Sequence, residues 1–237
     1  MIKTCGMACC SLSTSRSIMP SPSVYDNASG SSIRWDLPPK DLVAKLMKLT
    51  PYSRRLLKNF YRWMKDPNIQ LWCEDEAHFQ RHSSLIRMWS PKGQQPQVFS
   101  ASTREKVGFF GALDLKTGRL LTEEASTFNG ETFGYFLHYL LQSTQGKLLL
   151  ILDNAKYHRA RILKEFFVQN QEQLYLVFLP PYSPELNPIE RVWRITRRQV
   201  THNRYFASVI ELRTALTSHF VRWQRPNIAL EVLCAKI

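Results

Sequence analysis

The hydrophobic pattern divides the chain into short strands and helices from residue 69 onward. Short apolar runs bounded by turn-forming residues predict strands. The run at 147–153 (KLLLILD) is apolar up to its final residue, which is typical of a strand buried on both faces of a sheet. Strand-like runs lie at residues 69–74, 97–102, 107–113, 118–124, 147–153 and 174–179.

Three further segments carry helical spacing. Residues 129–142 begin with Asn129 as the N-cap and place large apolar side chains on one face. A second helix is predicted at 158–169, and a third starts with Asn187 as its N-cap and Glu190 as its third helical residue. Three strands followed by alternating helices and strands predict an α/β, ribonuclease-H-like fold, with a mixed five-stranded sheet flanked by helices.

The first 67 residues differ in composition from the rest. Residues 1–39 are rich in serine and poor in large apolar side chains, so we expect a disordered tail, because such a segment buries too little surface to offset its ordering entropy. Residues 40–67 carry leucines and aromatic residues at helical intervals broken by Pro51, which predicts two short basic helices. The remaining residues, 68–237, are expected to form one compact domain.

Three acidic residues stand where strands end or a helix begins: Asp75, Asp153 and Glu190. A charged group that ends a buried strand must be solvated, paired or bound to a metal. Carboxylate oxygens suit Mg²⁺ or Mn²⁺. Each residue alone has a structural alternative, as a solvated strand end, a helix N-cap or a capping-box glutamate. Their joint placement favours a shared metal site.

The charge of the chain points to an anionic partner. Its 237 residues carry a formal net charge of +13, which favours nucleic acid. The five cysteines have no paired CxxC spacing, which argues against a disulfide framework and a structural zinc site. The sequence has no run that approaches a membrane span and no secretion signal. We therefore expect a cytoplasmic protein without a membrane partner.

Basic residues cluster in the segment before residue 68 and in the helix that carries Glu190. The residues expected to contact DNA are Arg54, Arg55, Lys58, Arg62, Lys92, Lys156, His158, Arg191, Arg194, Arg197 and Arg198. Lys92 lies in the motif WSPKG, which predicts a turn with a basic tip. A solvated face is the alternative for the first basic segment, and second-shell water is the alternative contact for His158.

Four motifs, DEAHF, MWSPKG, LDNAKYH and LPPYSPELNPIERVW, resemble in this order the catalytic domain of DDE transposases of the mariner-related superfamily, especially those of bacterial insertion sequences. The resemblance covers residues 69–225. The 36 residues between Asp153 and Glu190 are close to the spacing of that family. The resemblance implies that Asp75, Asp153 and Glu190 bind two Mg²⁺ or Mn²⁺ ions, and that the neighbouring Glu74 and Glu76 do not.

The same resemblance implies an enzyme that cleaves DNA strands and transfers them during transposition. One ion would activate the attacking water or DNA 3′-hydroxyl, and the other would stabilise the leaving oxygen. The implied partners are double-stranded DNA, at the transposon ends and at the target, with a homodimer as one option for the assembly. The implied location is the nucleoid of a bacterial cell.

The sequence before residue 68 departs from the family pattern. Members carry one or two helix-turn-helix domains there, and the serine-rich start leaves no room for them. We therefore expect residues 40–67 to be a remnant of such a module in an N-terminally truncated chain. The alternative function is an inactive or domesticated remnant that only binds DNA. A glycosidase with two carboxylates fits the acids, but neither the basic charge nor the arginines after Glu190.

Overall fold

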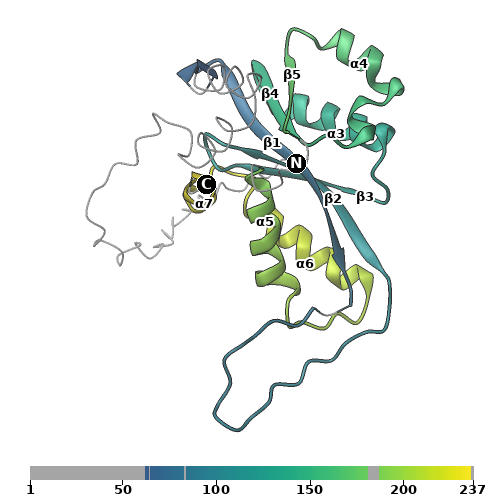
Figure 1. Cartoon of the computed structure of the whole chain (residues 1–237), viewed down its shortest axis with the longest axis vertical. Coiled ribbons are helices and arrows are strands. Elements are labelled where there is room, and N and C mark those ends of the chain that lie inside the picture. The colour runs from purple at the N-terminus through teal and green to yellow at the C-terminus, as the bar shows by residue number, and fades with distance from the viewer. Residues whose placement is uncertain (1–61, 64, 83, 181–186, 236–237) are drawn as a thin grey trace, which may run out of the picture. The chain divides into compact units, whose positions relative to one another are not determined.

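The computed structural model describes residues 62–63, 65–82, 84–180 and 187–235. Within them lies a five-stranded sheet of order β3-β2-β1-β4-β5 (Figure 1). The strands are β1 (Ile69–Gln80), β2 (Lys106–Asp114), β3 (Leu120–Ala125), β4 (Lys147–Leu152) and β5 (Leu174–Phe178). β1, β2 and β3 pair antiparallel, whereas β1, β4 and β5 pair parallel. The mixed sheet confirms the predicted fold class.

β1 lies at the centre of the sheet and is longer than predicted. It runs through Asp75 to Gln80, whereas the prediction ended the strand before Asp75. Its pairing with β2 continues to Gln80, but its pairing with β4 ends where Cys73 meets Ile151. The residues that follow Cys73 therefore lie beside the open carboxyl end of β4, where ligands bind in parallel α/β sheets.

The connection between β2 and β3 is a tight turn. Asp114 accepts hydrogen bonds from the backbone of Lys116 and the hydroxyl of Thr117, at 2.9 and 2.6 Å. Gly118 adopts a φ of 67°, a left-handed conformation that glycine enters without strain. The turn thus fixes the register of the outer hairpin.

The helices form two layers, one on each side of the sheet (Figure 1). α3 (Gly130–Ser143) begins as predicted, because the side chain of Asn129 accepts from the backbone N–H groups of Glu131 and Thr132. The other helices are α4 (Lys164–Gln169), α5 (Ile189–Thr196), α6 (Val209–Val221) and α7 (Ile228–Ala235). α5 continues into a π-helical turn, η4 (Arg197–Thr201). Among the described helices, none combines the length and apolar character needed to cross a bilayer.

Three predictions about these elements need correction. The helix expected at 158–169 is divided into two 3₁₀ turns, η1 (Lys156–Arg159) and η2 (Arg161–Leu163), followed by α4. The strand expected at 97–102 is absent from the described chain, because this stretch lies in the 84–105 loop, which extends away from the sheet (Figure 1). The N-cap expected at Asn187 is also wrong, because Pro188 occupies that position at the start of α5.

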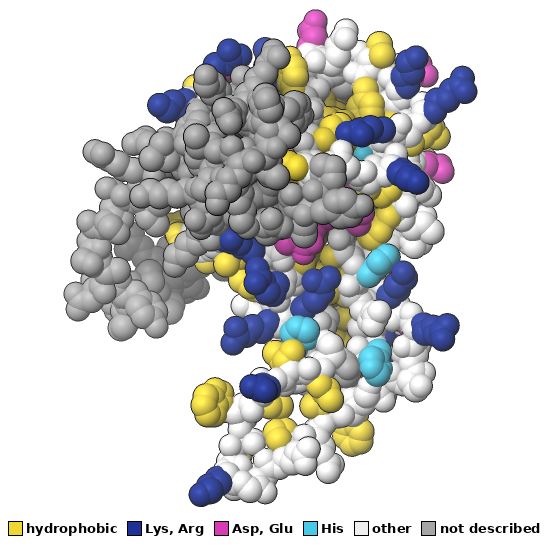
Figure 2. Space-filling view, viewed as in Figure 1, with side chains coloured by type: hydrophobic (Ala, Val, Ile, Leu, Met, Phe, Trp, Pro, Cys, Tyr) yellow, Lys and Arg dark blue, Asp and Glu magenta, His cyan; other side chains and the backbone are white. Residues whose placement is uncertain are grey.

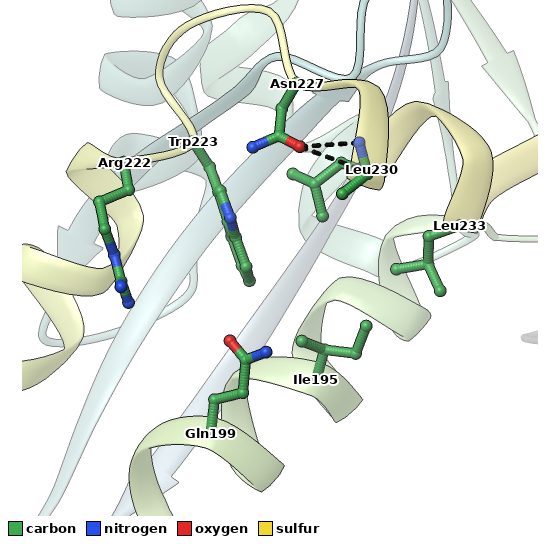
Figure 3. A pocket seen from close by; sticks show the side chains of 8 residues that line it. Ile195, Gln199, Arg222, Trp223, Asn227, Leu230 and Leu233 are labelled. Carbon is green, nitrogen blue, oxygen red and sulfur yellow. Dashed lines mark hydrogen bonds between the residues drawn. The ribbon is translucent and has the colours of Figure 1, made fainter. Parts of the chain in front are cut away.

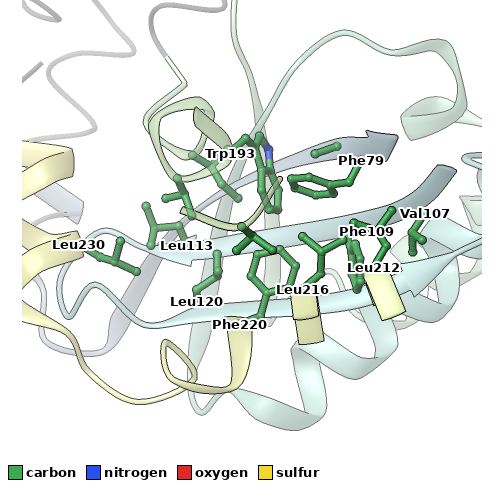
Figure 4. Packing of buried hydrophobic residues seen from close by; sticks show 14 of the residues in the cluster. Phe79, Val107, Phe109, Leu113, Leu120, Trp193, Leu212, Leu216, Phe220 and Leu230 are labelled. Carbon is green, nitrogen blue, oxygen red and sulfur yellow. The ribbon is translucent and has the colours of Figure 1, made fainter. Parts of the chain in front are cut away.

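Two apolar clusters hold the layers to the sheet. On one face, Phe79 and Phe109 pack with α5 and α6, as Figure 4 shows for Trp193 and Phe220. On the other face, Trp72 and Phe110 pack with α3. Because side chains alternate along a strand, the odd-numbered residues of β1 from 75 to 79 face α5 and the even-numbered residues from 72 to 76 face α3.

The N-terminal predictions lie outside the described residues. The serine-rich tail at 1–39 and most of the basic segment at 40–67 belong to that part of the chain. The predicted domain at 68–237 contains every described strand and helix named above. Its boundary stays a prediction.

Candidate active site

Three consecutive acids in β1 are divided between the two faces of the sheet. Asp75 faces α5, and the indole Nε1 of Trp193 donates a 3.0 Å hydrogen bond to its Oδ2. Glu74 faces the opposite side, where its Oε2 lies 3.4 Å from His158 Nε2. Strand alternation therefore delivers carboxyl groups of one strand to two separate environments.

The carboxyl group of Asp75 is enclosed and surrounded by negative charge. Burial, together with the charges of Glu190 and Glu76, raises the pKa of Asp75 to about 8, although the hydrogen bond from Trp193 acts in the opposite direction. Gly111 lies opposite Asp75 on β2. It makes room for the indole, because a Cβ at position 111 would lie 2.3 Å from Cη2 of Trp193.

α5 brings Glu190 into the range of Asp75. The helix starts one residue later than predicted, with Pro188 in the N-cap position and Glu190 as its second residue. Asn187 does not cap the helix. Its buried side chain instead donates from Nδ2 to the carbonyl oxygen of Glu74 at 2.9 Å. This contact holds the start of α5 against β1. Glu190 is therefore brought near Asp75, although the two acids are far apart in sequence.

Asp153 follows directly after β4. Ile151 pairs with Cys73 in the parallel register, so Asp153, two residues later, comes level with Asp75. Its side chain is 53% exposed, which leaves it accessible to an ion or a substrate. Its Oδ1 accepts a 2.8 Å hydrogen bond from the backbone N–H of Ala155 and lies 3.3 Å from His158 Nδ1.

Electrostatic effects link the three predicted acids through Glu76. Burial raises the pKa of Glu76, and the charges of Asp153 and Glu190 raise it further. Glu190 also raises the pKa of Asp75. Interactions between charges fall off with distance, so these pKa shifts indicate that the three acids lie in one region, at the carboxyl end of β4. Their role as metal ligands stays a prediction.

A second group of ligand atoms is compact. One atom each from Glu74, Glu76 and His158 lies within 4.8 Å of the others. Burial raises the pKa of Glu74 well above its usual range and lowers that of His158 to about 4, so the imidazole of His158 is uncharged at neutral pH. The family resemblance implied that Glu74 and Glu76 do not bind the metal ions. Their alternation with the apolar Trp72 was the signal that they point into the protein.

The residues predicted to contact DNA differ in their surroundings. Arg62, Lys92, Lys156, Arg194 and Arg198 are exposed, whereas Arg54, Arg55 and Lys58 lie outside the described residues. Arg191 and Arg197 are half-buried. Arg191 donates to the carbonyl oxygen of Leu233 in α7, and the guanidinium of Arg197 lies 5.5 Å from the ring centre of Phe79.

The prediction that His158 contacts DNA is wrong, because its side chain is 0% exposed. Figure 2 shows acidic side chains near the middle of one face, with Lys and Arg side chains gathered beside them. A phosphate could therefore reach basic groups next to the acids without contacting this histidine.

A groove of about 390 Å³ lies away from the acids, where the loop after α6 and the helix α7 pass over the end of α5 (Figure 3). Asn227 caps α7 there, accepting from the backbone of Ala229 and Leu230. The lining residues are Ile195, Gln199, Arg222, Trp223, Asn227, Ala229, Leu230 and Leu233. Of the predicted site residues that the structure describes, none lines this groove, so it is separate from the candidate active site.

Comparison with known protein families decides the classification. Residues 70–213 match the family described as DDE superfamily endonuclease. The chain belongs to this family. The DDE endonuclease chain is 26% identical over 141 residues to the uncharacterized 39 kDa protein of insertion element IS630 from Shigella sonnei. That match covers 59% of this chain and 41% of the relative, so the chain spans less than half the length of this relative.

Solved structures of the Mos1 mariner transposase share the fold of this DDE endonuclease. The Mos1 paired-end complex with the left transposon end matches with a TM-score of 0.60 at 16% identity, over 89% of this chain and 62% of the Mos1 chain. The isolated catalytic domain of Mos1 matches with a TM-score of 0.52 at 17% identity, over 77% of this chain and 83% of that domain. The ribonuclease-H-like prediction is thereby confirmed.

Proposed function

We propose that this DDE endonuclease is the catalytic part of a transposase, which cleaves DNA strands at transposon ends and joins them to a target, with residues 68–237 as its catalytic domain. One observation carries the proposal. β1, the end of β4 and the start of α5 bring carboxyl groups to one end of the sheet, where burial and mutual repulsion raise the pKa of Asp75 to about 8. Such a cluster favours a bound cation.

The donor set fits a hard divalent cation. Carboxylate oxygens are the preferred ligands of Mg²⁺ and Mn²⁺. Among the described residues, both carboxyl oxygens of Glu74 and one of Glu76 are buried without an aligned hydrogen bond, so acceptor oxygens beside the proposed ligands are left unsatisfied. Asp75, Asp153 and Glu190 are the proposed ligands of two such ions. When bound, the ions activate the attacking oxygen and stabilise the leaving oxygen of a phosphodiester.

The side chains around the acids orient them and hold the substrate. Trp193 fixes Oδ2 of Asp75 through its indole N–H, and Asn187 fixes the start of α5 against β1. Arg194 and Arg198 are exposed on the helical segment that begins with Glu190, so they can neutralise phosphates close to the scissile bond. In this way one helix supplies both a carboxylate and the charges that hold DNA.

Double-stranded DNA, at transposon ends and at a target, is the proposed partner, with a second copy of the chain. A surface for the second copy is offered by the 84–105 loop. Trp89, which precedes the turn at Lys92 and Gly93, is 100% exposed, and Leu85 at the base of the loop is 69% exposed. Apolar side chains that project together from a domain mark interaction surfaces. Sedimentation of the chain with and without DNA ends, and of Trp89→Ser, tests the assembly. A wild-type chain that stays monomeric with DNA would refute it.

A remnant that only binds DNA is the second candidate. DNA binding would need the arginines but not the acids. Like charges gathered at a buried position destabilise a fold unless a cation balances them. Asp75 is such a buried position, with the charges of Glu190 and Glu76 acting on it, and this arrangement therefore supports an enzyme.

Nicking of supercoiled plasmid tests the proposal. The wild-type chain should nick in Mg²⁺ or Mn²⁺ but not in EDTA, and Asp153→Asn should lose nicking while retaining DNA binding, because the amide keeps the shape but not the charge. Glu172→Gln removes an exposed carboxylate in the connection between α4 and β5 and is the matched control. Equal nicking by wild type and Asp153→Asn would refute the mechanism.

A further inference from the structure

Behind Asp153 lies a buried pair of polar side chains, His158 and Glu74. Both are 0% exposed. His158 Nε2 lies 3.4 Å from Glu74 Oε2, and its Nδ1 lies 3.3 Å from Asp153 Oδ1. The imidazole therefore bridges an acid in the middle of β1 and an acid at the end of β4.

The two ring nitrogens of His158 have different surroundings. Nδ1 lies 3.3 Å from the carbonyl oxygen of Asp153 as well as from its Oδ1. Both of these atoms are acceptors, whereas Nε2 makes no aligned hydrogen bond within the described chain, so the contacts of the ring are met when Nδ1 carries the hydrogen. The ring is held in this orientation by Phe133 and Tyr157, whose ring centres lie 4.5 and 4.4 Å away. His158 thus acts as a fixed donor toward Asp153.

A packing role alone does not explain why the buried side chains of His158 and Glu74 are polar. Within the described chain, His158 Nε2 and both side-chain oxygens of Glu74 are buried without an aligned hydrogen bond. Leaving buried polar atoms in this state costs about 1–3 kcal/mol each, and an apolar pair would avoid the cost. The benefit must lie in what the polar ring does for its exposed neighbour. Histidines and carboxylates that stand behind metal ligands have this orienting role.

We propose that His158 is a positioning residue, which holds Oδ1 of Asp153 from behind and so directs Oδ2 toward the cation, while Glu74 fixes the opposite edge of the ring. This inference rests on the proposed function, because it assigns Asp153 to the metal. The backbone N–H of Ala155 donates to the same Oδ1 at 2.8 Å. Two donors on one oxygen leave the other oxygen free of these contacts.

Two substitutions separate positioning from packing. In His158→Asn the amide nitrogen takes the place of Nδ1, so the donor to Asp153 is kept although volume is lost. In His158→Gln the amide reaches the place of Nε2, so more volume is kept but the donor is lost. We expect Mn²⁺ affinity, measured by calorimetry on the full chain, to fall less than about 3-fold in His158→Asn and about 10–100-fold in His158→Gln. Nicking should follow the same order, and DNA binding should not change.

The reverse order, with glutamine tolerated better than asparagine, would overturn the inference, as would equal affinities. So would direct ligation by His158, recognised by loss of Mn²⁺ binding in both variants. Glu74→Gln keeps a group that can bond to Nε2 and should bind Mn²⁺ nearly as well as wild type, whereas Glu74→Leu should weaken binding. Thermal melting of each variant separates these effects from unfolding.

A measurement without metal separates this inference from the proposed function. Long-range ¹H–¹⁵N NMR of the metal-free chain should show His158 protonated at Nδ1 and unprotonated at Nε2. If the wild type neither binds Mn²⁺ nor nicks DNA, the proposed function fails, and with it the inference. If the wild type does both but NMR shows the hydrogen on Nε2, only the inference fails.

Discussion

The indole ring of Trp193 occupies the space that a side chain at Gly111 would fill. Gly111 pairs with Asp75 across β1 and β2, and a Cβ on it would lie 2.3 Å from Cη2 of Trp193. Because β2 carries no side chain at this point, the indole N–H reaches Asp75 Oδ2 at 3.0 Å. A glycine on one strand therefore sets the orientation of an acid on the next.

Gly111→Ala should destabilise the protein and disturb the site. The added methyl group must displace the buried indole, and overpacking of this kind costs about 1–3 kcal/mol. Gly134→Ala is the matched control, because among the described residues its Cβ would meet just the end of one flexible side chain, Leu163 Cδ2, at 3.1 Å, and alanine favours the interior of α3. Urea unfolding of both variants measures the difference. Equal stability of the two variants would contradict the account of Gly111.

Trp193→Phe should shift metal binding to higher pH. The aromatic packing is largely kept, but the indole hydrogen bond, which lowers the pKa of Asp75, is lost. The pKa of Asp75 should then rise further above about 8. A metal must displace the carboxyl proton, so Mn²⁺ affinity should require more alkaline solution. Calorimetric titrations across pH 6–9 measure the midpoint, and an unchanged midpoint would show that the hydrogen bond has no such effect.

The metal-free protein should lose stability as pH rises toward 8. The ordinary pKa of Asp75 is 3.8, and in the fold it is raised to about 8. Between these values the unfolded chain has released the proton that the folded chain keeps, so the free energy of unfolding falls by about 1.4 kcal/mol per pH unit for this one group. Asp75→Asn removes that contribution. In EDTA, the variant should show a shallower decline than wild type, as measured by urea unfolding at pH 5–8.

The sequence predicted the parts of the site that follow local rules. The uninterrupted apolar run of β4 located Asp153, and the Asn129 cap located α3. The mixed five-stranded sheet also followed from the alternation of strands and helices. These features depend on side chains close together in sequence, so periodicity and capping are sufficient to find them.

The remaining features depend on contacts between distant segments. Asparagine is a common N-cap residue, but the side chain of Asn187 donates its hydrogen bond to the carbonyl oxygen of Glu74, far away in sequence. His158 is a polar residue that packing buries completely, which no local pattern reveals. The run at 97–102 has strand-like residues but no partner strand within the described chain, so it stays a loop. Tertiary structure overrides local preference in each case.

Asn203 should hold the base of the 84–105 loop. It has a φ of 55°, and its side chain forms two hydrogen bonds with the backbone of Ile86, at 2.9 and 3.1 Å. Asn203→Gly keeps the backbone conformation without strain but removes both bonds. The amide hydrogen of Ile86 should then exchange with solvent at least about 5-fold faster, since one lost hydrogen bond costs about 1 kcal/mol. Asn203→Ala should be less stable still, because alanine disfavours a positive φ.

DNA binding should depend steeply on salt through the exposed arginines that follow Glu190. Each phosphate contact contributes about −0.9 to the slope of log affinity against log salt concentration. Replacing both Arg194 and Arg198 by alanine should therefore make the slope shallower by about 2, with similar losses for unrelated DNA sequences. Arg213→Ala is the matched control, because this arginine is already paired with Glu124 at 2.8 Å. The measurement is fluorescence anisotropy on random duplex DNA from low to moderate salt. A double variant with the wild-type slope would show that the phosphates are bound elsewhere. A shallower slope in Arg213→Ala alone would show that DNA contacts α6 instead.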